Sequence, residues 1–189
     1  MASERKQQIL ETLAHMLENP RREKITTASL AAKLTVSEAA LYRHFANKAQ
    51  MFEGLIEFIE ASIFGVINKI MTDEPDGTKQ VQLIVTMLLK FAEKNPGMTR
   101  VLIGDALVNE DEHLQTRITM LFDRVEASLK QSLKIAIAHD ENGMGKKIMP
   151  EAQANLLMSF VIGRWHQFAK SGFKRKPTEH VQQQLSLLN

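Results

Sequence analysis

The chain has 189 residues, of which 44% are hydrophobic and 24% charged, and its net charge is +2. These proportions are typical of a globular protein with a hydrophobic core. The absence of cysteine excludes disulfides, thiolate metal sites and cysteine nucleophiles. The first ten residues contain no long apolar run, so we expect no signal peptide. No apolar run approaches the roughly 18 residues of a membrane-spanning helix, so we expect no membrane partner.

Apolar residues recur at helical spacing, and all five prolines interrupt that pattern. A first helix precedes Pro20, a short second helix covers about 27–33, a third follows Ser37, and a long fourth follows Asn47 and ends before TDEPDG. Further helices are predicted over about 78–94, 98–109, 111–138 and 151–171, with a loop over 139–147 and a short helix at the C-terminus. The predicted fold class is therefore all-α, with about nine helices.

Positive charge gathers in the N-terminal part. Residues 1–50 carry eight Lys or Arg and five Asp or Glu, a net charge of +3, whereas the rest of the chain sums to −1. A difference this small can arise by chance. It also fits an N-terminal section that contacts an anion, for which nucleic acid is the leading candidate.

The segment VSEAALYRHF, residues 36–45, has the signals of a short capped helix. Ser37 is a good N-cap, and Val36 before it is placed to contact Leu41 as a hydrophobic staple. Leu41 and Phe45 lie four residues apart, so we expect both to point into the core. With the preceding helix and the tight LTV link, this pattern predicts a helix-turn-helix unit.

The outward faces of the third helix carry groups that suit DNA. Glu38 can accept from a cytosine amino group, and a small alanine can contact a thymine methyl. Tyr42, Arg43 and His44 can donate hydrogen bonds to phosphates. Each residue taken singly is also an ordinary surface or core-edge residue, but their combination at this spacing favours DNA binding.

The start of the long fourth helix places a cation in an unusual position. Asn47 is the expected N-cap, and Gln50 three residues later forms a variant of the capping box. Lys48 then occupies the first helical position, where a cation opposes the helix dipole by roughly 0.3–1 kcal/mol. That placement suggests an external anion such as a phosphate. The alternative is a solvated lysine that costs almost nothing.

Residues 25–56, ITTASLAAKLTVSEAALYRHFANKAQMFEGLI, resemble the tetracycline-repressor (TetR) family of bacterial transcription factors. The shared pattern is a threonine-capped helix followed by VS, LY, HF and a lysine. Thr35 departs from it, because many members carry a turn glycine there. The resemblance implies a homodimer whose three-helix heads, residues 1–49, bind palindromic double-stranded DNA. Residues 50–189 would form a helical domain for dimerisation and for binding a partner or ligand.

The family pattern extends the set of DNA-binding residues. It implies that Thr27, Tyr42, His44 and Lys48 hold phosphates. The bases would face Glu38, Ala39, Ala40 and Arg43. Ser37 belongs to the same recognition helix.

The similarity continues to about residue 131, in segments such as NPGMTRVLIGDAL and LFDRVEASLKQ. It points toward family members that act in nucleoid occlusion. This implies a cytoplasmic, nucleoid-associated protein that binds the C-terminal tail of the tubulin-like division protein FtsZ while on DNA, and so blocks division rings over the chromosome. Higher-order assembly on DNA stays open. The implied tail site lies between the fourth and fifth helices, at Phe58, Met87, Lys90, Lys94 and Asn95.

The segment at 152–173, AQANLLMSFVIGRWHQFAKSGF, is apolar around most of a helical circumference. Such a helix must be buried on several sides, and pairing with its mate in a two-fold dimer would supply that cover. We therefore assign Phe160, Gly163 and Trp165 to the dimer interface. Gly163 costs about 1 kcal/mol relative to alanine, which close helix approach would explain. Trp165 is either an interface anchor or a core residue.

Two other functions are weighed. A ligand-responsive TetR-type repressor is the alternative, because Met87, Met98, Met120 and Met158 suit an adaptable pocket as well as a core. An enzyme is disfavoured. The sequence contains no HExxH motif, no Gly-rich phosphate loop, no nucleophile elbow and no metal-ligand spacing of histidines. We expect no cofactor, no metal and no catalytic residues.

Overall fold

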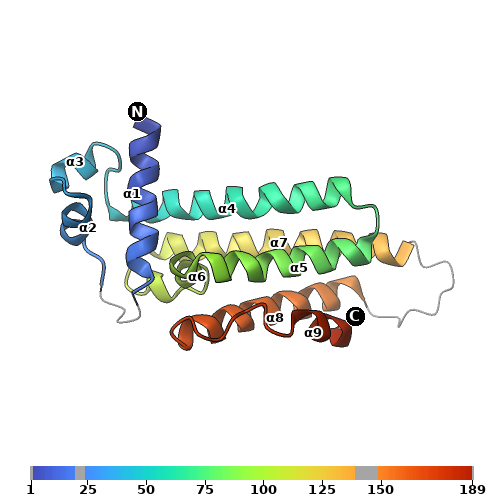
Figure 1. Ribbon diagram of the computed structural model, residues 1–189. Coiled ribbons are helices and arrows are strands. Elements are labelled where there is room, and N and C mark those ends of the chain that lie inside the picture. The colour runs from blue at the N-terminus through green and yellow to red at the C-terminus, as the bar shows by residue number, and fades with distance from the viewer. Residues whose placement is uncertain (1, 20–23, 139–148, 189) are drawn as a thin grey trace. The chain divides into compact units, whose positions relative to one another are not determined.

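The computed structural model describes residues 2–19, 24–138 and 149–188. In these ranges the regular structure is helical throughout, which confirms the all-α prediction (Figure 1). The elements are α1 (Ala2–Leu17), α2 (Thr27–Leu34), α3 (Glu38–Tyr42), α4 (Lys48–Asp73), α5 (Gly77–Lys94), α6 (Pro96–Leu102), the 3-10 helix η1 (Asp105–Leu107), α7 (Glu112–Ala138), α8 (Pro150–Lys170) and α9 (Val181–Leu188). The loop predicted over 139–147 lies outside the described residues.

The first helices begin where side-chain caps satisfy free backbone groups. The side-chain oxygens of Thr26, Ser37 and Asn47 each accept a hydrogen bond from the backbone N–H three residues further on, at 3.1, 3.3 and 2.8 Å. Thr35 ends α2 with φ 58° and ψ 44°, in the left-handed region that favours glycine. The threonine thus adopts the turn backbone itself, so the turn forms without the family's glycine.

Two predicted helices differ in the structure. The prediction of a single helix over 98–109 is wrong, because α6 ends at Leu102 and the separate helix η1 follows it. Gly104 lies between them with φ 75°, a backbone conformation that cannot continue a right-handed helix. The third helix, expected within residues 36–45, ends at Tyr42, and Arg43 already forms its C-cap.

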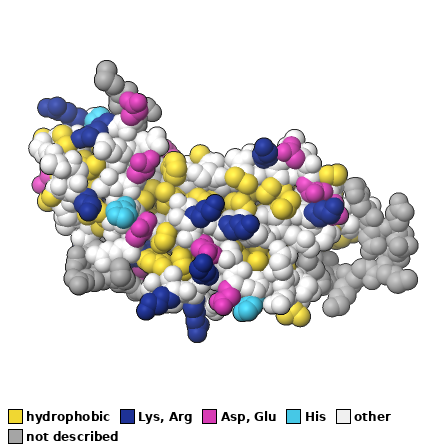
Figure 2. Space-filling model, in the orientation of Figure 1, with side chains coloured by type: hydrophobic (Ala, Val, Ile, Leu, Met, Phe, Trp, Pro, Cys, Tyr) yellow, Lys and Arg dark blue, Asp and Glu magenta, His cyan; other side chains and the backbone are white. Residues whose placement is uncertain are grey.

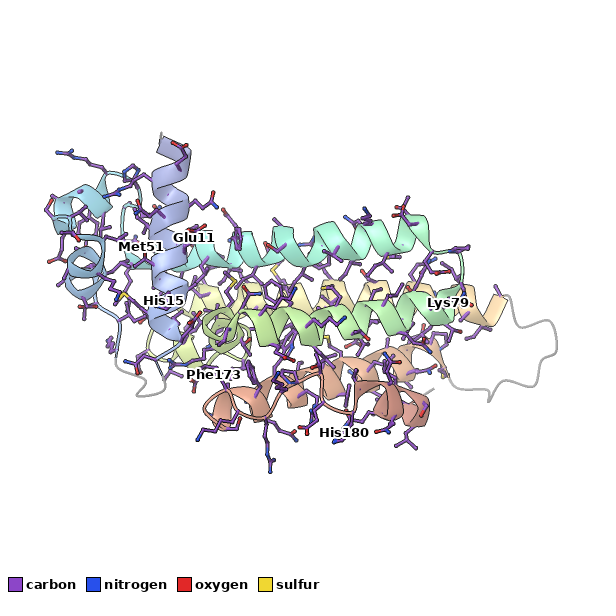
Figure 3. The ribbon with its side chains drawn as sticks, viewed as in Figure 1. Glu11, His15, Met51, Lys79, Phe173 and His180 are labelled. Atoms are coloured by element: carbon purple, nitrogen blue, oxygen red, sulfur yellow. The ribbon has the colours of Figure 1, made fainter. Side chains whose placement is uncertain are left out.

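The described residues group into two compact units. The first contains residues 1–60 and 95–118. In it α1 packs on α2 and α6, and α2 packs on α3 (Figure 1). Met51, in the first turn of α4, lies buried among these helices (Figure 3). The core of this unit includes Leu13, Leu30, Leu41, Phe52 and Val101.

The second unit contains residues 61–94 and 119–189. In it α5 packs along α8, and α9 packs back on α8 (Figure 1). The connection between α8 and α9 is held by an edge-to-face contact of Phe168 and Phe173, with ring centroids 5.2 Å apart (Figure 3). Its core includes Ile63, Ile84, Leu88, Leu129 and Trp165. No helix among the described residues combines the length and the apolar character needed to span a bilayer.

Candidate functional site

A chain of hydrogen bonds joins α2 to α3 on the surface of the head. The Tyr42 hydroxyl donates to Oγ1 of Thr27 at 3.3 Å, and Thr27 Oγ1 donates to Oε2 of Glu38 at 2.6 Å. The sequence predicts separate DNA contacts for these three residues. The structure brings them together, so the position of each polar group is fixed before any DNA arrives.

The remaining residues predicted on this face differ in exposure. Ala39 and Arg43 are exposed, whereas Ala40 and His44 are half-buried. The Ser37 hydroxyl is exposed but already serves as the α3 cap. Several Lys, Arg and His side chains project over α1, α2 and α3 (Figure 2). This surface therefore presents small residues beside cations, the combination that a DNA groove and its phosphates require.

Lys48 has an anionic partner within the chain. Its Nζ lies 2.5 Å from Oε1 of Glu110, with the lysine side chain 22% exposed and the glutamate 13%. The ammonium also lies 5.6 Å from the ring centroid of Phe52. The inference that Lys48 needs an external anion assumed no such partner, and that step was wrong. A phosphate contact by Lys48 stays a prediction based on the family pattern.

The residues assigned to the FtsZ-tail site fall in both units. Phe58 is exposed on α4 and Asn95 precedes α6, both in the first unit. In the second unit, one face of α5 carries residues spaced by three or four positions, which therefore share one side of the helix: Leu83, Met87, Lys90 and Lys94. Met87 is half-buried and the other three are exposed. Hydrophobic side chains with Lys or Arg among them gather along α4 and α5 (Figure 2).

The three residues assigned to the dimer interface have different environments in α8. Trp165 is 0% exposed within its own chain, and its indole N–H donates to the Leu88 carbonyl oxygen at 3.2 Å. It is a core residue, so the interface assignment of Trp165 was wrong. Phe160 is half-buried. Gly163 is exposed, and a Cβ added there would meet no atom within 4 Å.

The four methionines proposed to line an interior pocket do not share one environment. Met98 and Met158 are buried in the cores of different units. Met120 is 58% exposed and therefore cannot line an interior pocket. The core-filling interpretation fits the two buried methionines.

Two family models match the chain. Residues 23–55 match the model described as "Bacterial regulatory proteins, tetR family". Residues 76–189 match SlmA-like_C, described as "Tetracyclin repressor-like, C-terminal domain". The first model covers α2 and α3, which carry the hydrogen-bonded face described above.

Curated relatives agree with these models over nearly the whole chain. The nucleoid occlusion factor SlmA of Shewanella oneidensis is 52% identical over 180 residues, which are 95% of this chain and 90% of that protein. SlmA of Shewanella sediminis is 51% identical over the same shares. This chain belongs to the SlmA family of nucleoid occlusion factors. The family lies within the TetR-type regulators, as the N-terminal motif predicted.

Solved structures agree with the SlmA-family chain in fold. The transcriptional regulator FadR from Bacillus subtilis, in complex with stearoyl-CoA, has a TM-score of 0.78 at 12% identity and covers 96% of both chains. The TetR-family regulator PfmR from Thermus thermophilus also has a TM-score of 0.78, at 19% identity over 95% of this chain and 96% of its own. At these identities the likeness concerns the fold alone, and it confirms the predicted TetR-like architecture.

Sequence reasoning missed Glu110 and Arg100. Glu110 lies 62 positions from Lys48, and no local spacing connects them. Arg100 is buried and pairs with Asp105 through Nε at 2.9 Å. The signal for Arg100 is its charge among the apolar positions of MTRVL, whereas Glu110 lies in the wholly polar stretch NEDEH and has no such signal.

Proposed function

We propose that this protein is a nucleoid occlusion factor that binds palindromic DNA as a homodimer and, while bound, captures the C-terminal tail of FtsZ. Residues 1–49 form its DNA-binding domain, and residues 50–189 carry dimerisation and partner binding. The observation that carries the proposal is 51–52% identity to curated SlmA proteins over 95% of the chain. Association with the nucleoid follows from DNA binding.

The DNA-binding part of the proposal is supported by the surface of α2 and α3. The short side chains of Ala39 and Ala40 allow α3 to approach base edges closely, and Arg43 beside them is exposed. Tyr42 and Thr27 are placed by their mutual hydrogen bond. Each hydroxyl has a single proton, so binding a phosphate oxygen requires that proton to turn from its present acceptor to the phosphate. Glu38 accepts from Thr27 through one carboxylate oxygen, which leaves the other for a cytosine amino group.

Selection from a random-sequence duplex pool tests DNA binding. The wild-type protein should enrich a palindrome whose half-sites lie about one helical turn, or a related spacing, apart. Recovery of no preferred sequence would contradict the proposed DNA function. The enriched duplex then serves as the probe in the experiments below.

The FtsZ part of the proposal is supported by the α5 face of Leu83, Met87, Lys90 and Lys94. An exposed leucine and a half-buried, adaptable methionine offer apolar contacts. The two exposed lysines next to them suit acidic groups on a peptide. Val66 on α4, also in the second unit, is a further exposed apolar side chain. Phe58 and Asn95, which belong to the first unit, are assigned to FtsZ binding by the family resemblance alone.

Co-sedimentation with polymers of FtsZ from the same organism tests partner binding. The wild-type protein should sediment with the polymers, and Lys90→Glu should reduce the amount bound. The matched control is Lys174→Glu, the same charge reversal at an exposed lysine between α8 and α9. Binding of DNA but not of FtsZ polymers would favour a ligand-responsive repressor, for which release from DNA by small molecules is the assay.

Coupling between DNA and FtsZ binding is the regulatory part of the proposal. The single helix α4 begins at Lys48, within the DNA-binding domain, and runs unbroken to Asp73. It therefore carries Lys48, assigned to DNA, and Phe58, assigned to FtsZ. DNA binding, which fixes the angle between the two heads, would then change FtsZ affinity. Equal FtsZ affinity with and without the enriched duplex would contradict the coupling.

A further inference from the structure

Glu110 occupies a well-defined turn between η1 and α7. Its backbone N–H donates to the Leu107 carbonyl oxygen at 3.1 Å, and Asn109 before it has φ 63°. The turn directs the Glu110 carboxylate to Lys48, 2.5 Å away. Because Glu110 is only 13% exposed, the pair is partly shielded from water and is stronger than an ordinary surface ion pair.

The position of Lys48 in α4 is electrostatically unfavourable for a cation, and a nearby anion compensates it. Lys48 is the first residue of the helix, at the positive end of the dipole. Glu110 supplies the compensating charge, and Phe52 supplies the ring face. The neighbouring cation, Arg100, is engaged elsewhere: its Nε pairs with Asp105, and its Nη1 donates to the Leu17 carbonyl oxygen.

While the Lys48 ammonium stays paired with Glu110, its attraction to a DNA phosphate is weakened. An ammonium is a compact charge, and a phosphate beside it would meet the Glu110 carboxylate as a second anion. The two anions therefore repel one another and compete for the same ammonium. The pair also lines a pocket of about 320 Å³ with Phe52 and Val108, which leaves space for Lys48 to change its rotamer.

We infer that Glu110 is an internal competitor of DNA: it holds Lys48 in the free protein and must release it when a phosphate binds. The inference rests on the DNA-binding function proposed above. As a consequence, the protein binds DNA less tightly than it would if Lys48 had no partner within the chain. By thermodynamic reciprocity, DNA binding also releases Glu110 and the turn that carries it.

Glu110→Gln tests the competition, because it removes the negative charge and keeps the side-chain shape. The probe is the enriched duplex, measured by fluorescence anisotropy over a series of salt concentrations. We expect DNA binding about three- to tenfold tighter than wild type, the size expected of a partly buried ion pair. The slope of log K against log salt should steepen by up to about one, because Lys48 now replaces a phosphate counterion without exposing a new carboxylate. Glu112→Gln, the same change at an exposed residue of α7, should give little tightening.

A double-mutant cycle separates competition from general repulsion. Lys48→Ala alone should weaken DNA binding uniformly across sequences. The steepening of the salt slope by Glu110→Gln and its reduction by Lys48→Ala should sum to about one, because Lys48 makes a single phosphate contact. In the Lys48→Ala background, Glu110→Gln should no longer tighten binding. Equal tightening in both backgrounds would overturn the inference, because Glu110 would then act on DNA directly.

The other outcomes are also decisive. If Lys48→Ala weakens binding while Glu110→Gln leaves it unchanged or weaker, the inference fails and the DNA-binding proposal stands. If the wild-type protein enriches no sequence, both fail. Thermal unfolding of each variant establishes that it is folded under the binding conditions.

Discussion

Nη1 of Arg100 donates a hydrogen bond to the carbonyl oxygen of Leu17, 3.0 Å away, so α6 holds the last residue of α1. The last carbonyls of a helix have no partner within it, and a cation there also interacts favourably with the dipole. Arg100 is only 7% exposed, and Asp105 pairs with its Nε. A buried charge network thus fixes the end of the first helix of the DNA-binding head.

Gly97 allows α1 and α6 to approach closely enough for this contact. A Cβ at Gly97 would overlap the carbonyl oxygen of Ala14. We expect Gly97→Ala to lower the free energy of unfolding by about 1–3 kcal/mol, measured by urea denaturation, because backbone atoms must move apart. Gly65→Ala is the control: the site on α4 is open, so the change should be neutral or stabilising by up to about 1 kcal/mol. Equal effects of the two substitutions would contradict the tight packing at Gly97.

Tyr42→Phe removes one hydroxyl from the proposed DNA surface. The side chain is 45% exposed and its hydrogen bond to Thr27 is long, at 3.3 Å. Stability should therefore change by less than about 0.5 kcal/mol. DNA affinity should fall by about 1–2 kcal/mol, because a hydrogen bond to a charged phosphate is lost. Anisotropy with the enriched duplex and with a scrambled duplex checks this, and a loss confined to the enriched sequence would instead indicate base contact.

Gly163→Glu tests the proposed dimer face of α8. The site is open within one protomer, so the fold should persist, as judged by circular dichroism. In a two-fold pair, two carboxylates would face each other across the interface, and such juxtaposition of like charges costs several kcal/mol. Sedimentation equilibrium should show a dimer dissociation constant raised by more than about tenfold. Gly65→Glu, at an equally open site on α4, should leave dimerisation unchanged.

Thr178→Val tests the hydrogen bond that joins the segment before α9 to α5. The Thr178 hydroxyl donates to Oε2 of Glu93 at 2.5 Å. That hydrogen bond is the main cause that lowers the pKa of Glu93 below its ordinary value of 4.5, and Lys176 lowers it further while burial opposes. A lowered folded-state pKa contributes stability above the unfolded-state value, and this contribution is lost as pH falls through the folded-state value.

The stability difference between wild type and Thr178→Val should therefore be largest above the ordinary pKa of Glu93 and shrink toward acid pH. Urea unfolding from neutral to acid pH measures it. In a Glu93→Gln background the difference should become independent of pH over this range. A difference that persists at acid pH would mean that the valine acts through packing and not through the carboxylate.

The sequence by itself determined the local structure and the family. Caps at Thr26, Ser37 and Asn47 fix where α2, α3 and α4 begin, because a cap satisfies backbone groups only three residues away. The spacing of Leu41 and Phe45 identifies the buried side of the recognition helix, and both are buried. These signals extend over only one or two helical turns, so they can be recognised in the sequence. They were sufficient to predict an all-α, TetR-like chain.

Only the tertiary structure decided the partners of isolated charges and large apolar groups. In the sequence Lys48 has no evident partner, because Glu110 is 62 residues away. Trp165 fits an interface as well as a core, and only its hydrogen bond to the Leu88 carbonyl oxygen, 77 residues away, places it in the core. The left-handed Gly104 likewise divides a segment whose apolar spacing looks continuous. Helical periodicity specifies which residues share a face. It does not specify which other face meets them, because that depends on how distant helices pack.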